Sequence, residues 1–167
     1  MSQFLLNLIS KISYIAEIIR KIMVSLMCFY FLLVILQVIF RYVLNASLFW
    51  AEEVVRYSMI WSVMLGSALL AYESAHIRID LIDHTLSKNL LKYIYITCDI
   101  LLILFAILLL LSGIKFVERT FMQKSASLDV PMWFVYVAIP ISAFLHILFV
   151  IAKMIKNNSS IQSNITE

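Results

Sequence analysis

The chain of 167 residues is 63% hydrophobic and only 14% charged, and its mean hydropathy is +0.99. Soluble domains average about 45–50% apolar and about 25% charged residues, so this composition excludes an ordinary soluble domain and indicates an integral membrane protein. The net charge of +3 indicates membrane topology and contact with lipid, and not binding of nucleic acid.

Apolar residues recur with helical spacing at the start of the chain, at Leu5, Leu8, Ile12, Ile15, Ile19 and Ile22. Polar residues lie largely away from that face. Residues 1–21 are therefore predicted to form an amphipathic helix that lies at the membrane surface or leads into the first span. A cleavable signal peptide is disfavoured, because no charge precedes the first apolar residues and no small-residue cleavage site follows them.

Four long apolar runs follow, and we expect transmembrane helices at about residues 22–40, 54–72, 93–113 and 134–152. The first run has 19 residues, which as a helix span about 29 Å and match a bilayer core of about 30 Å. Two glycines and two prolines in the whole chain favour helices over tightly turned β structure. The predicted fold class is an all-α integral membrane protein, with a four-helix transmembrane domain over residues 22–153 and a polar tail over residues 154–167.

Four spans place both termini on the same side of the membrane. The N-terminal segment, the second loop and the tail carry eight Lys and Arg residues, whereas the first and third loops with their flanks carry five. Because cytoplasmic loops are enriched in Lys and Arg, both termini are predicted to be cytoplasmic.

Ionisable residues cluster around the loop between the first two spans. Arg41 ends the first span, and Trp50, Glu52, Glu53 and Arg56 open the second. The spacings Glu52–Arg56 (i,i+4) and Glu53–Arg56 (i,i+3) place both acid–base pairs on one helix face. Two interpretations stay open: interfacial anchoring by solvated salt bridges of little energetic weight, or a polar bracket that docks this loop onto a partner. Arg41 lies on the side that the positive-inside rule disfavours, which suggests a specific acidic partner.

The second span carries two stripes of small residues that each repeat every four positions: Ser58, Ser62 and Gly66, and Ser67, Ala71 and Ala75. Such stripes let helices approach closely in lipid. Trp50, Tyr57 and Trp61 lie along another face. Packing among the four helices of this chain explains part of the pattern. A second partner helix is the alternative, because two small faces exceed what one neighbour needs.

A polar segment follows the second span and contains Glu73, His76, Arg78, Asp80, Asp83 and His84. The i,i+4 pair of His and the calcium-loop spacing are both missing, so a solvated interfacial loop is favoured over a metal site. His76 and Asp80 are the candidates for a structural contact at this inner end.

Two ionisable residues, Asp99 and His146, lie inside predicted spans, where such groups are functional candidates. Asp99 is expected to accept a hydrogen bond near the inner interface, since a proton relay needs a longer chain of groups. Haem ligation by His146 and His76 is disfavoured because His76 falls beyond its span. Cys28 and Cys98 lie in apolar runs without metal-ligand spacing, so no metal and no cofactor are expected.

The third loop ends in a proline and aromatic residues. Pro131 precedes the fourth span, and Trp133 suits a position at the outer interface. Pro140 lies one or two turns inside the helix and is predicted to bend it or to open its first turns.

Three segments share a pattern with a known family: FRYVLNASLFWAEEVVRYSMIW, LGSALLAYESAHIRIDLI and SASLDVPMWFVYVAIPIS. Together, in this order and on four spans, they resemble the small membrane subunit of tripartite ATP-independent periplasmic (TRAP) transporters, the DctQ-like family. The resemblance covers about residues 20–153. One minor departure is Ser127, which separates Ala126 from Leu128 where the family more often has an uninterrupted small-Leu pair.

The resemblance implies a bacterial inner-membrane protein that binds a large TRAP permease subunit and works with a periplasmic substrate-binding protein. The large subunit is expected to carry the substrate and Na⁺ sites, and the small subunit to brace it without a substrate site of its own. C4-dicarboxylates, sialic acids and sugar acids are all candidate substrates. Candidate interface residues, besides the outer and inner clusters already named, are Trp61, Gly66, Pro131, Trp133 and Pro140.

Three other classes of function were weighed. A small proton-coupled exporter needs a buried acid, yet Glu52 and Glu53 are interfacial and Asp99 has no mirrored repeat. A membrane haem protein needs two His at matched depth, which three His residues barely permit. A stand-alone membrane scaffold or assembly protein shares the interaction role, and only the identity of its partner separates it from the transporter subunit.

Overall fold

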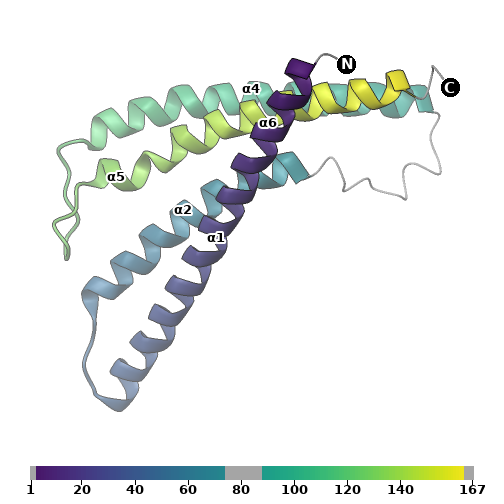
Figure 1. Ribbon diagram of the computed structural model, residues 1–167. Helices are drawn as coiled ribbons and strands as arrows, with labels where there is room; N and C mark the ends of the chain where they lie inside the picture. Colours follow the sequence, from purple (N-terminus) through teal and green to yellow (C-terminus); the bar gives the residue numbers. More distant parts are fainter. Residues whose placement is uncertain (1–2, 74–87, 164–167) are drawn as a thin grey trace.

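The computed structural model describes residues 3–73 and 88–163 (Figure 1). Its helices are α1 (Gln3–Val43), α2 (Phe49–Glu73), α4 (Lys88–Thr120), α5 (Met132–Tyr136) and α6 (Ala138–Ser163). Four stretches of these helices are long and apolar enough to cross a membrane: Ser10–Val43, Phe49–Glu73, Tyr93–Thr120 and Met132–Ile155. The two described ranges contain no strand, so the all-α membrane fold with four transmembrane helices is confirmed.

The long helices form a layer that is one helix thick except where α1 crosses α6. Across the layer α1 packs against α2, α2 against α6, and α6 against α4, whereas α1 meets α6 only over a short crossing. Figure 1 shows two antiparallel hairpins, α1–α2 and α4–α5–α6, which converge near the first half of α1 and diverge toward the loop after α1. A layer of this kind leaves both of its faces open to lipid or to a partner.

The apolar core lies where α1, α2 and α6 converge. Its buried members are Ile12, Ala16 and Ile19 of α1, Leu65, Ala68 and Leu69 of α2, and Phe149 and Ala152 of α6. The rings of Tyr72 and Phe149 add a tilted contact with centroids 5.2 Å apart.

A separate amphipathic helix over residues 1–21 is not confirmed, because α1 continues without a break into the first span. Its residues include no Gly or Pro, so nothing in the sequence ends the helix before the span begins. Ile12 and Ile19 are buried in the core, while Ile15 and Ile22 of the same predicted face remain exposed. The first five turns of α1 therefore pack partly on protein.

Two glycines mark close approaches between neighbouring helices. A methyl group on Gly66 would lie 2.8 Å from the sulfur of Met23 in α1, and one on Gly113 would lie 2.9 Å from Ile139 in α6. Gly66 thus serves packing within this chain, as predicted for part of the small-residue stripes.

The fourth span is broken at Val137, between α5 and α6. Pro140 has no backbone N–H and cannot donate to the carbonyl of Tyr136 four residues earlier. The helical hydrogen bonds continue on either side of this missing bond: Val137 N donates to Trp133 O at 2.9 Å, and Ile141 N donates to Val137 O at 3.2 Å. The interruption is therefore limited to Val137 and the hydrogen bond that Pro140 cannot donate, and the first turns of the span stay helical.

Candidate functional site

Polar side chains gather at the two ends of the layer. We call the end with loops 44–48 and 121–131 the hairpin end. The opposite end, where α1 begins and α2 finishes, is the terminal end. The hairpin end contains most of the candidate residues from the sequence, whereas His76 and Asp80 lie outside the described residues.

Glu53 ties the start of α2 to the loop between α4 and α5. Its carboxylate accepts hydrogen bonds from the backbone N–H groups of Ser127 (3.0 Å) and Leu128 (3.2 Å). The residue is only 9% exposed. A local pair with Arg56 is not formed, because this carboxylate is occupied by the loop backbone; the salt bridges of the described residues lie elsewhere.

The loop that Glu53 holds is a tight hairpin. Ser125 N donates to Val130 O at 2.9 Å, and Met132 N donates to Gln123 O at 2.9 Å. Asp129 turns the chain with a left-handed φ of 53°, a conformation that Asp tolerates better than most residues. The Glu53 carboxylate thus supplies partners for two backbone N–H groups of this turn, in hydrogen bonds that are partly buried.

Aromatic residues of α5, which follows this loop, pack against the start of the loop and against α2. Trp133 stacks on Phe121 with ring centroids 6.1 Å apart, and Trp61 lies against Phe134 with centroids also 6.1 Å apart. The Tyr57 hydroxyl donates to the sulfur of Met132 at 3.6 Å. Pro131 stands at the N-cap of α5 with extended backbone. Trp50 remains half-exposed at the start of α2.

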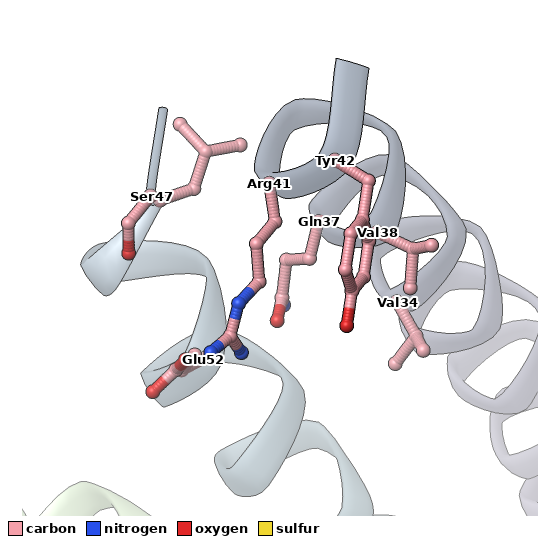
Figure 2. Close-up of a pocket in the computed structure, with 8 residues that line it drawn as sticks. Val34, Gln37, Val38, Arg41, Tyr42, Ser47 and Glu52 are labelled. Carbon is pink, nitrogen blue, oxygen red and sulfur yellow. The ribbon is translucent and has the colours of Figure 1, made fainter. Parts of the chain in front are cut away.

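A second feature of the hairpin end is a pocket of about 180 Å³ between the end of α1 and the start of α2 (Figure 2). It is lined by Val34, Gln37, Val38, Arg41, Tyr42, Ser47, Leu48 and Glu52. Figure 2 shows Arg41 extending from α1 toward the first turn of α2, which carries Glu52. Arg41 and Glu52 are both candidates from the sequence, and both line this pocket. The salt bridges of the described residues do not include the predicted pair of Glu52 with Arg56.

At the terminal end, Arg20 links α1 to the end of α2. Its guanidinium donates to Glu17 at 2.8 Å and also to Glu73 at the end of α2. The hydroxyls of Ser13 and Tyr72 share a hydrogen bond of 2.8 Å. Sequence reasoning used Arg20 only for topology and missed this cluster, since its partner in α2 lies 53 residues away.

Asp99 forms a buried ion pair with Lys153. Lys153 Nζ lies 2.9 Å from Asp99 Oδ1, and the two side chains are 12% and 9% exposed. The predicted hydrogen bond of Asp99 is therefore present, with a partner that the sequence did not identify. The signal was available in principle, because antiparallel neighbours bring the start of α4 beside the end of the fourth span.

The other intramembrane candidate, His146, is tied to its own helix. Its Nδ1 lies 3.0 Å from the carbonyl oxygen of Ser142, one turn earlier. Cys28 and Cys98 are free thiols. Over residues 3–73 and 88–163, no group of three or more His, Cys, Asp and Glu could hold a metal ion.

Comparison with known proteins places this architecture in a family. Residues 30–158 match the model of the family described as "Tripartite ATP-independent periplasmic transporters, DctQ component". The chain belongs to the DctQ family. It is also similar to a Haemophilus influenzae protein that bears the name of a TRAP transporter small permease protein, with 24% identity over 146 residues. That alignment covers 87% of this chain and 84% of the relative.

Two of the three family-like segments meet at the hairpin end of this DctQ protein. The segment after the first span contributes the pocket and Glu53, and the SASLDV segment supplies the backbone that Glu53 holds. The remaining segment, LGSALLAYESAHIRIDLI, lies partly outside the described residues. As a TRAP transporter component with four apolar helices, the protein is a multi-pass protein of the inner membrane.

Proposed function

We propose that this chain is the small permease subunit of a sodium-coupled, binding-protein-dependent secondary transporter for organic acids, and that it braces the large permease subunit. Membership of the DctQ family supports the transporter assignment. The bracing role is supported above all by the one-layer arrangement of the helices.

The layer buries little of its own apolar surface. Buried residues make up none of the most apolar stretch of Ser10–Val43, 28% of that in Phe49–Glu73, 11% of that in Tyr93–Thr120 and 33% of that in Met132–Ile155. Helices in a membrane associate through packing and hydrogen bonds between close surfaces. A flat layer of spans therefore offers a broad face to a larger helical protein and widens its footprint in the bilayer.

The substrate and Na⁺ sites belong, in this proposal, to the large subunit. The two buried acidic residues of the described ranges already have partners, since Asp99 pairs with Lys153 and Glu53 holds loop 121–131. C4-dicarboxylates, sialic acids and sugar acids remain the candidate cargo. No nucleic acid takes part.

Orientation follows from the distribution of Lys and Arg. Both termini are cytoplasmic and the hairpin end faces the periplasm, where the substrate-binding protein approaches. Trp50, Glu52 and Arg56 then fix the periplasmic end against the first span or the large subunit, while Glu53 contributes by holding loop 121–131 in place. His76 and Asp80 have the same role at the cytoplasmic end.

Gentle solubilisation of the tagged chain from its native membrane tests the proposal. A large polytopic protein should copurify in a stoichiometric amount, and the pair should drive Na⁺-dependent uptake of an organic acid when reconstituted with the binding protein. Glu53→Gln should weaken recovery of the pair, whereas the matched variant Glu118→Gln, at an exposed position of α4, should not. Recovery of the chain alone, coloured by haem or transporting by itself, refutes the bracing role.

A further inference from the structure

The pocket at the hairpin end is open to the bilayer along one face of α1. Val34, Val38 and Arg41 follow one another at i, i+4 and i+7, so they share this face. Both valines are exposed, at 40% and 51%. The pocket therefore has an apolar wall that reaches toward the membrane interior and a charged rim at the end of the span.

The polar groups of the pocket lack partners of their own. Neither Arg41 nor Glu52 takes part in the salt bridges of the described residues. The side-chain nitrogen of Gln37, one turn before Arg41, is buried and has no hydrogen-bond partner in that part of the chain. An unsatisfied buried donor is costly, which points to a partner that the protein itself does not supply.

We propose that this pocket binds the headgroup of an ethanolamine phospholipid from the leaflet at the hairpin end. The phosphate accepts hydrogen bonds from the Arg41 guanidinium and, after a rotation of the Gln37 side chain that exposes its buried nitrogen, from the Gln37 amide. The ammonium donates to the Glu52 carboxylate. An acyl chain lies along Val34 and Val38. The inference concerns this chain by itself and does not depend on the proposed transporter function.

The charges of the pocket select among headgroups. A phosphatidylglycerol headgroup has a negative charge and no ammonium, so Arg41 attracts it but the Glu52 carboxylate repels it. A choline headgroup carries a cation without N–H donors and cannot hydrogen-bond to Glu52. The pocket volume of about 180 Å³ is below the usual range of roughly 300–1,000 Å³ for drug-sized ligands. It suits a headgroup whose acyl chains remain in the bilayer.

Native mass spectrometry of the full-length purified chain tests the assignment. The protein in a mild detergent is mixed with equal amounts of palmitoyl-oleoyl phosphatidylethanolamine, phosphatidylcholine and phosphatidylglycerol, and the retained lipid is counted. We expect one phosphatidylethanolamine, retained about tenfold over phosphatidylcholine, as suits one charge-assisted hydrogen bond. Glu52→Gln should cut this preference to within about twofold and raise retention of phosphatidylglycerol.

Variants of the other two polar groups separate binding from folding. Arg41→Gln should lower retention of all three lipids, and Gln37→Leu should do so more weakly without changing their ratio. Arg119→Gln and Glu118→Gln remove exposed charges from the last turns of α4 and should leave the ethanolamine preference intact. Size-exclusion profiles and helical circular dichroism confirm that each variant is folded.

Two kinds of result overturn the proposal, one from lipid retention and one from crosslinking. One is equal retention of the three lipids by the unaltered chain, or an unchanged ethanolamine preference in Glu52→Gln. The other comes from a photo-crosslinking residue placed at Ser47 in native membranes. A polypeptide adduct at that position assigns the pocket to a protein partner, whereas a lipid adduct supports the proposal.

Discussion

Removing one member of the Asp99–Lys153 pair should destabilise the protein far more than removing both. At 2.9 Å and an effective dielectric of about 20, two unit charges attract by about 6 kcal/mol. Desolvation of two buried ions offsets much of that energy. Lys153→Met leaves Asp99 charged and without its cation, and such a broken buried pair costs about 3–5 kcal/mol. The double variant Asp99→Leu/Lys153→Met leaves no buried charge and should lie within about 1 kcal/mol of the unaltered protein.

A double-mutant cycle measures the difference. Unfolding of the four proteins, Asp99→Leu, Lys153→Met, the double variant and the parent, is followed by circular dichroism during titration of mixed micelles with dodecyl sulfate. We expect a coupling energy of several kcal/mol between the two sites. The control is Lys115→Met, at an exposed position of α4, the helix that carries Asp99. This variant should change the free energy of unfolding little. If both single variants unfold within about 1 kcal/mol of the parent, the pair is solvated in the membrane and the reasoning is wrong.

Other contacts give further expectations. Gly113→Ala should cost about 1–3 kcal/mol of stability in thermal unfolding, because its methyl group would meet Ile139 and the backbone nitrogen of Pro140 at 2.9 and 3.2 Å. Gly66→Ala meets only the flexible end of Met23 and should stay within about 1 kcal/mol; equal losses at both sites would contradict this argument. Glu53→Gln should speed hydrogen exchange at the amides of Ser127 and Leu128 several-fold, while Glu118→Gln leaves them unchanged; protected amides in both variants would exclude Glu53 as their partner. Arg20→Gln should barely shift the thermal midpoint, since its ion pairs are about half exposed; a large shift would show that this cluster is buried in the membrane protein.

The transmembrane spans were predictable because a helix that crosses the hydrocarbon core of a bilayer must be long and apolar. About 20 apolar residues in a row satisfy this rule, and four such runs are visible in the sequence. The same rule does not decide what the N-terminal segment packs against. A helical stripe of isoleucines looks alike whether it faces a lipid interface or a protein core, and here Ile12 and Ile19 face a core that α2 and α6 complete.

The candidate site was predictable in residue identity but not in pairing. Local spacing joined Glu53 to Arg56, because i,i+3 neighbours are the pairs that a sequence reveals. The structure joins Glu53 to backbone amides 74 and 75 residues away. The Asp99–Lys153 pair is 54 residues apart in sequence. Such contacts depend on which helices are neighbours, and the order α1–α2–α6–α4 differs from the order along the chain.

That order has a consequence for biosynthesis. α6 leaves the ribosome after α1, α2 and α4, yet it lies between α2 and α4 and contacts both. Until α6 enters the bilayer, the first hairpin and α4 lack the helix that joins them. During this interval, lipid or an insertase must occupy the space between them that α6 later fills. If translation stops before residue 138, the first hairpin and α4 remain without the helix that packs between them. Quality-control proteases can recognise such an incompletely packed product.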